Sequence, residues 1–311
     1  MQRFNTLLLR EWMQHRTGWL VLMTVPFVLA LLGAIFGDVK LRLGAPDVHV
    51  QMGGMPIPIS EGALPMAVFA LGGTALLTVL LVWMANLLQA PGLARRDQQD
   101  RSIEFWLSLP AGHVQSLGAT LLMHLVLMPV AAMLAGLAGG AVVALVLVVK
   151  VYGLGALASM HWLTLMVAVA AGLARSVLGL MLATLWLSPM ILGTMAASAW
   201  LKRWGLPAVI GGTTVGHLLL SKVYGITILG DTITEWMVEA GAALGGAGGR
   251  GVQPQTETVT DFGSALRAFP IWAMRDGVAA IEDLASPLLL AGLAIAALSF
   301  ALLLVRRQRG A

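Results

Sequence analysis

Five ionisable side chains lie within or at the ends of long apolar runs and are the first candidates for chemistry: Arg175, His124, His161, His217 and Lys150. A charge is costly in hydrocarbon, so an ionisable residue inside a membrane-spanning segment is a functional candidate by default. The first four residues could line a path for a polar substrate. The structural alternatives are that the lysine extends to the outer interface, the arginine sits at a helix end, and each histidine hydrogen-bonds a neighbouring helix.

The most polar segment of the chain, residues 91–112, carries a second set of candidates. Asp97 or Asp100 can cap a helix N-terminus, and Pro110 ends the helix that follows. The spacing predicts a short amphipathic helix, which either docks into the groove of a partner protein or lies as a solvated turn held at the headgroups by Trp106. Its apolar face, at i, i+3 and i+4, comprises Ile103, Trp106 and Leu107.

Several catalytic motifs are absent from the sequence. It contains no G-x-x-x-x-G-K-[ST] phosphate loop, no H-E-x-x-H and no G-x-S-x-G. It also contains no cysteine, which excludes disulfides and thiol-ligated metals. We therefore expect no ATPase site, metal or bound cofactor on this chain. The alternative is a membrane enzyme acting on lipid or glycan, for which the candidate outer-face residues are Asp231, Glu235, His161 and Asp261.

The elements that position these residues follow from the composition. Hydrophobic residues make up 58% and charged residues 11% of the 311 positions, whereas a soluble domain carries about 25% charged residues. The apolar residues form runs of about 20 or more, the length with which a helix crosses about 30 Å of hydrocarbon. Lipid offers no hydrogen-bond partners, so these runs must be helices. The expected fold is all-α, with residues 1–311 forming one polytopic transmembrane domain.

About six spans are expected. Residues 150–174 are assigned to an outer-face or re-entrant helix, and residues 224–285 to an outer region of short amphipathic helices broken near Pro270. If the basic turns at Arg95-Arg96 and at Lys202-Arg203 are both cytoplasmic, an even number of spans must lie between them. Two spans are preferred, because four would have to be short or tightly turned. The expected spans cover about 17–36, 64–88, 115–148, 176–200, 206–223 and 286–305.

Charge indicates the orientation. The basic residues form small clusters at the ends of the apolar runs, which is an orientation signal and not a nucleic-acid surface. Eleven of the 19 Lys and Arg residues fall on the side that would carry both termini. Both ends are therefore expected in the cytoplasm of a bacterial inner membrane, with no cleaved signal peptide. Residues 1–16 predict an interfacial helix, with Leu7, Leu8 and Trp12 on the apolar face and Arg10 on the polar face.

Three segments resemble the membrane subunits of the type 2 family of ATP-binding-cassette (ABC) exporters. Arg96-Asp97 and residues 101–110, RSIEFWLSLP, are similar to the family's cytoplasmic loop, which reads R-R-D-x-S-I-x-F-W-x-S-L-P. Residues 9–16, LREWMQHR, resemble its N-terminal elbow helix, and residues 198–203, SAWLKR, resemble its turn before the fifth span. The order and spacing of the three segments extend the resemblance over essentially the whole chain, except for about 130–175 and the outer region.

The resemblance implies a permease without an ATPase site of its own. ATP and Mg would bind to separate cytoplasmic ABC ATPase subunits, and the loop helix would pass their closure to the spans as a rigid-body shift. A second membrane subunit, identical or a sister chain, would complete the transporter. The resemblance leaves the substrate open, and a non-transporting anchor or sensor is a third interpretation. The implied coupling residues are Asp97, Asp100, Arg101, Ile103, Glu104, Phe105, Trp106 and Leu107, and the elbow residues are Arg10, Glu11 and Trp12.

Overall fold

The computed structural model of the protein describes residues 2–37, 49–52, 55–58, 62–99, 112–245 and 261–309. It is a helical protein with one small antiparallel hairpin, β1 (His49–Met52) and β2 (Met55–Pro58). The helices are α1 (Gln2–Phe36), α2 (Ala63–Gln99), α4 (His113–Leu122), the π-helix η1 (Met123–Leu127), α5 (Met128–Tyr152), α6 (Leu154–Ser159), α7 (Trp162–Leu201), the 3-10 helix η2 (Lys202–Trp204), α8 (Gly205–Val223), α9 (Ile228–Gly245), α10 (Phe262–Glu282), the 3-10 helix η4 (Asp283–Ala285) and α11 (Pro287–Arg309).

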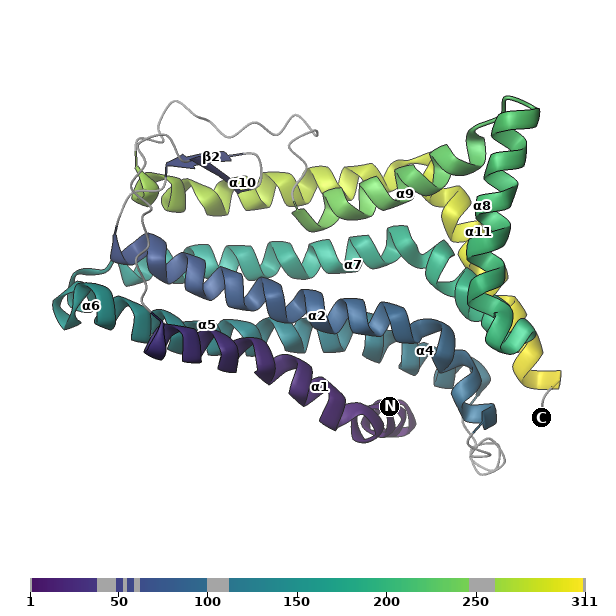
Figure 1. Cartoon of the computed structure of the whole chain (residues 1–311), viewed down its shortest axis with the longest axis horizontal. Coiled ribbons are helices and arrows are strands. Elements are labelled where there is room, and N and C mark those ends of the chain that lie inside the picture. The colour runs from purple at the N-terminus through teal and green to yellow at the C-terminus, as the bar shows by residue number, and fades with distance from the viewer. Residues whose placement is uncertain are drawn as a thin grey trace.

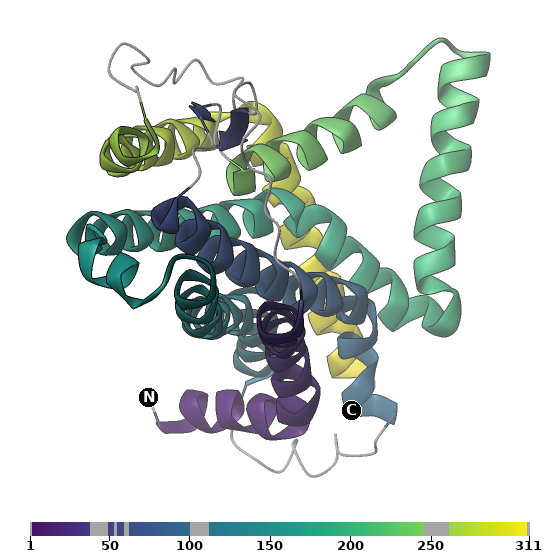
Figure 2. The same cartoon turned by 60° about the vertical axis from the view of Figure 1, so that its left-hand side comes forward.

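Five described stretches are long and apolar enough to cross a bilayer, as expected for a multi-pass membrane protein. The fourth stretch contains two helices, α7 and α8, which η2 joins. α8 buries only Gly205, where its start packs against α7; near its other end it meets α9, and its middle stands clear of the other helices (Figure 2). The stretches are Phe4–Phe36, Ala63–Leu93, His113–Tyr152, Trp162–Val223 and Pro287–Gln308.

The long helices α2, α5 and α7 lie side by side along the longest axis of the molecule, with α1 on one side and α9 and α10 on the other (Figures 1 and 2). The start of α1, the end of α2, the turn between α7 and α8, and the end of α11 all lie toward one end of this bundle. α6 and the start of α10 lie at the opposite end. The bundle therefore has two distinct ends, one of which gathers both chain termini.

Small residues let α2 and α5 approach closely. A Cβ atom at Gly136 would lie 2.7 Å from the Cα of Ala75, and one at Gly140 would lie 2.9 Å from the Cα of Leu71. Backbones of membrane helices come this close only where side chains are absent, as the Gly136-x-x-x-Gly140 spacing indicates. The similar spacing that begins at Gly33 has no such role, because nothing lies within 4 Å of a Cβ atom placed there.

The expected outer-face or re-entrant helix at 150–174 is wrong, because these residues belong to three helices. α5 ends at Tyr152, where Gly153 adopts a φ of 79° that favours glycine. After the short α6, residues 162–174 form the first turns of the 40-residue α7. Lys150 is exposed near the end of α5, and its Nζ caps the C-terminus of α1 by donating to the carbonyl oxygens of Ala34, Ile35 and Gly37 at 3.0, 2.9 and 2.8 Å.

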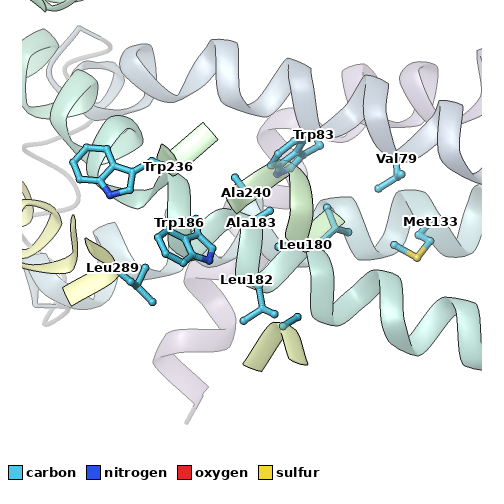
Figure 3. Packing of buried hydrophobic residues seen from close by; sticks show 12 residues of the cluster. Val79, Trp83, Met133, Leu180, Leu182, Ala183, Trp186, Trp236, Ala240 and Leu289 are labelled. Carbon is cyan, nitrogen blue, oxygen red and sulfur yellow. The ribbon is translucent and has the colours of Figure 1, made fainter. Parts of the chain in front are cut away.

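The predicted outer region also differs from the structure, because its helices pack along the bundle. Trp236 and Ala240 of α9 lie in the largest core cluster, beside Trp186 and Ala183 of α7 (Figure 3). α10 runs unbroken through Pro270, so the predicted break there is wrong. A proline inside a helix costs about 3 kcal/mol, and here the neighbouring Trp272 is buried in a cluster with α2 and α7, which offsets that cost.

Candidate functional site: an apolar pocket with a buried ion pair

A pocket of about 370 Å³ lies between α2, α5, α7, α9 and α10. Aliphatic and aromatic side chains form nearly all of its wall, and the few polar ones include Arg175 and Ser176. Concave sites of about 300–1,000 Å³ with apolar walls and few polar groups are typical of small-molecule binding. Its wall includes Leu71, Val79, Trp83, Met133, Phe269 and Trp272.

Arg175 forms a buried ion pair at the edge of this pocket. Its Nε donates to Oδ2 of Asp276 at 2.6 Å, and its NH2 lies 2.5 Å from the same oxygen. Its NH1 donates to the carbonyl oxygen of Ala243 at 2.9 Å. The two charged residues are only 8% and 1% exposed. Arg175 therefore connects α7 to α9 and α10, and Asp276 neutralises its charge.

Glycines permit this geometry. A Cβ atom at Gly179, one turn after Arg175, would lie 2.5 Å from the carbonyl oxygen of Ala243 and 2.9 Å from the Arg175 NH1. A Cβ atom at Gly277, directly after Asp276, would lie 3.3 Å from Leu178. Gly179 must be glycine for α9 to come near enough to α7 for the Arg175–Ala243 bond to form, whereas the end of the Leu178 side chain could move away from a Cβ atom at position 277.

Two indole N–H groups of the pocket wall lack hydrogen-bond acceptors. Trp83 and Trp272 are 6% and 8% exposed, and no acceptor among the described residues bonds to the Nε1 of either one. A buried donor without a partner costs about 1–3 kcal/mol. An acceptor that reached either N–H would remove this cost, and both Nε1 atoms are covered in this conformation.

The structure separates the four candidate path residues. Arg175 borders the pocket, whereas the other three do not. His161 is exposed and precedes the first turn of α7. His217 is half-buried in α8, where its ring lies against the backbone of α9 at Gly230. His124 belongs to a different polar cluster, between α1 and η1.

That second cluster is centred on Glu11, which is fully buried. Its Oε1 accepts from Arg10 NH2 at 2.5 Å and from Thr120 Oγ1 at 3.1 Å, and its Oε2 lies 4.0 Å from Nδ1 of His124. Sequence periodicity placed Arg10 on the polar face of an interfacial helix, but the arginine is 6% exposed. α1 is continuous from Gln2 to Phe36, and its first turns run across the direction of its remainder (Figure 2).

His124 is held by its neighbours on three helices. Its Nδ1 lies 3.0 Å from the Thr120 carbonyl oxygen and must carry the proton, since a carbonyl only accepts. Asn86 of α2 donates to the His124 carbonyl at 2.6 Å and accepts from Trp19 of α1 at 3.2 Å. The bond from Asn86 explains the π-helical segment, because the side chain donates to the main-chain carbonyl of His124 and so interrupts the regular hydrogen bonding of the helix there.

The residue types of this cluster could also hold a metal. One possible ligand atom from each of Glu11, His15 and His124 lies within 4.8 Å of the others. A dication would have to share the carboxylate with the Arg10 guanidinium, which already supplies its counter-charge at 2.5 Å. We therefore assign the cluster to the packing of α1 on α2 and η1.

The predicted coupling residues lie almost entirely outside the described structure. Asp97 falls in the last turn of α2, of whose side chains nothing is described. The elbow residue Trp12 packs beside the cluster formed by Trp19, Met23 and Met123. The coupling residues outside the described ranges are Asp100, Arg101, Ile103, Glu104, Phe105, Trp106 and Leu107.

The candidate residues for a lipid or glycan enzyme are dispersed. Asp231 and Glu235 lie on α9, whose start is at the end of the bundle opposite to the starts of α7 and α10 (Figure 1). Asp231 accepts from Thr227 at 2.6 Å. Asp261 caps α10, because its Oδ1 accepts from the backbone N–H of Ser264 at 2.6 Å. These residues do not form an acid–base pair with one another.

The Asp261 cap predicts a local pH dependence. The hydrogen bond from the Ser264 backbone is the main reason that the pKa of Asp261 lies below its ordinary value of 3.8. A lowered pKa means that the cap stabilises α10 at neutral pH and is lost as the pH falls through the folded-state pKa. Asp261→Ala should make hydrogen exchange in the first turn of α10 about fivefold faster at pH 7. Asp261→Asn keeps an acceptor and should not, and equal rates in the alanine variant and the wild type would contradict the assignment.

The described residues at the pocket form an apolar site beside a buried ion pair. Arg175 and Asp276 bond to each other, and Arg175 also donates to the Ala243 carbonyl. The pocket that this ion pair borders is apolar. The neighbouring polar cluster joins helices. No family model, curated protein or solved structure matches the chain.

Proposed function

We propose that the chain is the membrane-spanning permease subunit of an ABC exporter. The observation that carries the proposal is the apolar pocket between α2, α5, α7, α9 and α10, because a molecule that crosses the bilayer needs a binding site among the spans. The resemblance of residues 96–110 to the cytoplasmic loop of type 2 exporter subunits supports the same function. ATP and Mg would bind to the separate ATPase subunits.

The arrangement of the chain ends is consistent with this function. Arg306 near the end of α11 donates to the carbonyl oxygen of Ala199 near the end of α7, at 3.3 Å, and η2 follows directly with Lys202 and Arg203. Cations gathered at one end of the bundle mark the cytoplasmic side. The start of α1 and the end of α11 both lie toward this end of the bundle (Figure 1), so an even number of spans would place both termini in the cytoplasm, at a bacterial inner membrane.

α2 provides a mechanical connection between the proposed partner and the pocket. One face of α2, from Val68 to Trp83, lines the pocket, and the same helix continues to Gln99, into the proposed coupling loop of residues 91–112. Closure of two ATPase subunits against the loop helix would move α2 as a rigid rod and reshape the pocket wall. A second membrane subunit would supply the other half of the path.

The test is co-purification of the tagged chain with its ATPase subunit from native membranes. Trp106→Ala should weaken the assembly about 30-fold, as expected for an aromatic anchor worth about 2 kcal/mol, and Ile103→Asp should abolish it. Trp204→Ala is the matched control, since Trp204 is 64% exposed, in the turn between α7 and α8. The coupling role is wrong if assembly and ATP-dependent transport are unchanged in both loop variants. Lipid turnover by the chain alone would favour an enzyme, and a chain without any nucleotide response would favour an anchor or sensor.

A further inference from the structure

The residues that line the pocket carry two hydrogen-bond donors for which the described part of the chain offers no acceptor. The indole Nε1 atoms of Trp83, on α2, and Trp272, on α10, are buried and have no acceptor among the described residues. Both side chains are more than nine-tenths buried. Both Nε1 atoms are covered in this conformation, so an acceptor in the pocket would reach either N–H only after the indole turns. Buried tryptophan N–H groups usually find a partner, and such a turn toward a bound acceptor would supply one.

Water is a poor occupant of this pocket. An ordered buried water makes about three hydrogen bonds to polar groups. Around Trp83 and Trp272 the wall is formed mainly by aliphatic and aromatic side chains, including Val79, Leu173 and Phe269. Water at either indole would gain one strong bond and lose most of its others, whereas an apolar molecule would cover the wall.

The charge of the pocket selects among apolar molecules. Arg175 is the basic residue of the described wall, and its guanidinium is committed to the Asp276 carboxylate and the Ala243 carbonyl. The ion pair has no net charge, so the site gives neither an anion nor a cation a counter-charge. A charged ligand would lose its hydration in the pocket without gaining a counter-charge, which is unfavourable.

We propose that the pocket binds a neutral, predominantly apolar molecule with at least one acceptor oxygen, such as a ketone or ester, which accepts from the Trp83 or Trp272 indole N–H. As the identity of an exported substrate, this rests on the function proposed above. The binding itself requires no ATPase subunit. A membrane lipid with ester carbonyls and a free ketone share this chemistry, and the choice of lipid in the assay separates them.

The experiment uses benzophenone, a neutral apolar ketone that photo-crosslinks to nearby C–H groups, on the full chain in nanodiscs. Ether lipids, which lack ester carbonyls, are compared with ester lipids. In ether lipids, saturable crosslinks should map to the pocket segments of α2, α7 and α10. Ester lipids that reduce this labelling would identify membrane lipid as a natural occupant, and unchanged labelling would assign the site to free molecules.

Competition measures the role of the acceptor. Unlabelled 4-methylbenzophenone should compete about tenfold better than 4-methyldiphenylmethane, which has the same skeleton without the carbonyl. The anionic 4-benzoylbenzoate should compete poorly. Equal competition by ketone and hydrocarbon, or by the neutral and anionic ketones, would overturn the proposal without the use of any variant.

Variants then assign the donors. In Trp83→Phe/Trp272→Phe the aromatic surfaces remain and the N–H groups are lost, so the tenfold preference for ketone should disappear. Trp162→Phe/Trp204→Phe, which changes two exposed indoles, should retain it. A preference that persists in the pocket variant would contradict the assigned donors. Since no ATPase subunit is present in the nanodiscs, the labelling results test ligand binding independently of the co-purification test.

Discussion

Replacement of Arg175 by alanine is expected to destabilise the helix bundle by about 3–5 kcal/mol. The carboxylate of Asp276, 1% exposed, would lose its counter-charge, and the carbonyl of Ala243 would lose its donor. A buried charge without a partner is among the most costly defects in a protein interior, and water cannot reach this one freely. The measurement is the free energy of unfolding in mixed detergent micelles titrated with a denaturing detergent.

Removal of both charges is the sharper test of this explanation. Arg175→Leu/Asp276→Leu leaves no charge behind, so it should cost much less than either single change, within about 1–2 kcal/mol of the wild type. Arg203→Ala, at an exposed arginine of η2, is the control and should cost less than about 0.5 kcal/mol. Additive losses in the double variant would show that the two residues stabilise the bundle independently of their ion pair.

The sequence identified Arg175 as a candidate but could not identify its partner. Asp276 lies 101 residues further along the chain, in a segment assigned to the outer surface. The amphipathic pattern of α10 is the same whether its apolar face meets lipid headgroups or another helix. Only tertiary contact distinguishes the two cases, so neither the burial of Asp276 nor the pocket beside it could be read from periodicity.

The same arginine explains an error in the span boundaries. An unpaired arginine is costly in hydrocarbon, which is why the predicted span began after Arg175. In the structure α7 begins at Trp162 and passes through Arg175 without interruption, because Asp276 neutralises the charge. Helix type was predictable from long apolar runs, whereas helix ends depended on whether each charge had a distant partner.

A similar limit applies to the N-terminal helix. The spacing of Leu7, Leu8 and Trp12 predicted an apolar face and therefore placed Arg10 in water. The structure buries Arg10 and Glu11 together against Thr120 and His124. No local pattern indicates that two oppositely charged neighbours will be buried as a pair, nor that the opposing segment is a π-helix.

Substitution of Gly140 by leucine is expected to destabilise the bundle by about 3 kcal/mol and to reduce the yield of monodisperse protein. A Cβ atom there would lie 2.9 Å from both the Cα and the carbonyl oxygen of Leu71, which are backbone atoms that a change of rotamer cannot move. α2 and α5 would have to separate, and α2 also carries Trp83 and the pocket wall.

Gly33→Leu is the matched control, because nothing lies within 4 Å of a Cβ atom at that position of α1. It should be neutral or slightly stabilising, since glycine inside a helix costs about 0.5–1 kcal/mol relative to alanine. The comparison is made on the midpoint of thermal unfolding in detergent. If the two variants unfold at the same temperature, α2 and α5 do not depend on this close approach. If only Gly140→Leu unfolds early and also loses benzophenone labelling, the contact that packs the two helices also maintains the shape of the pocket.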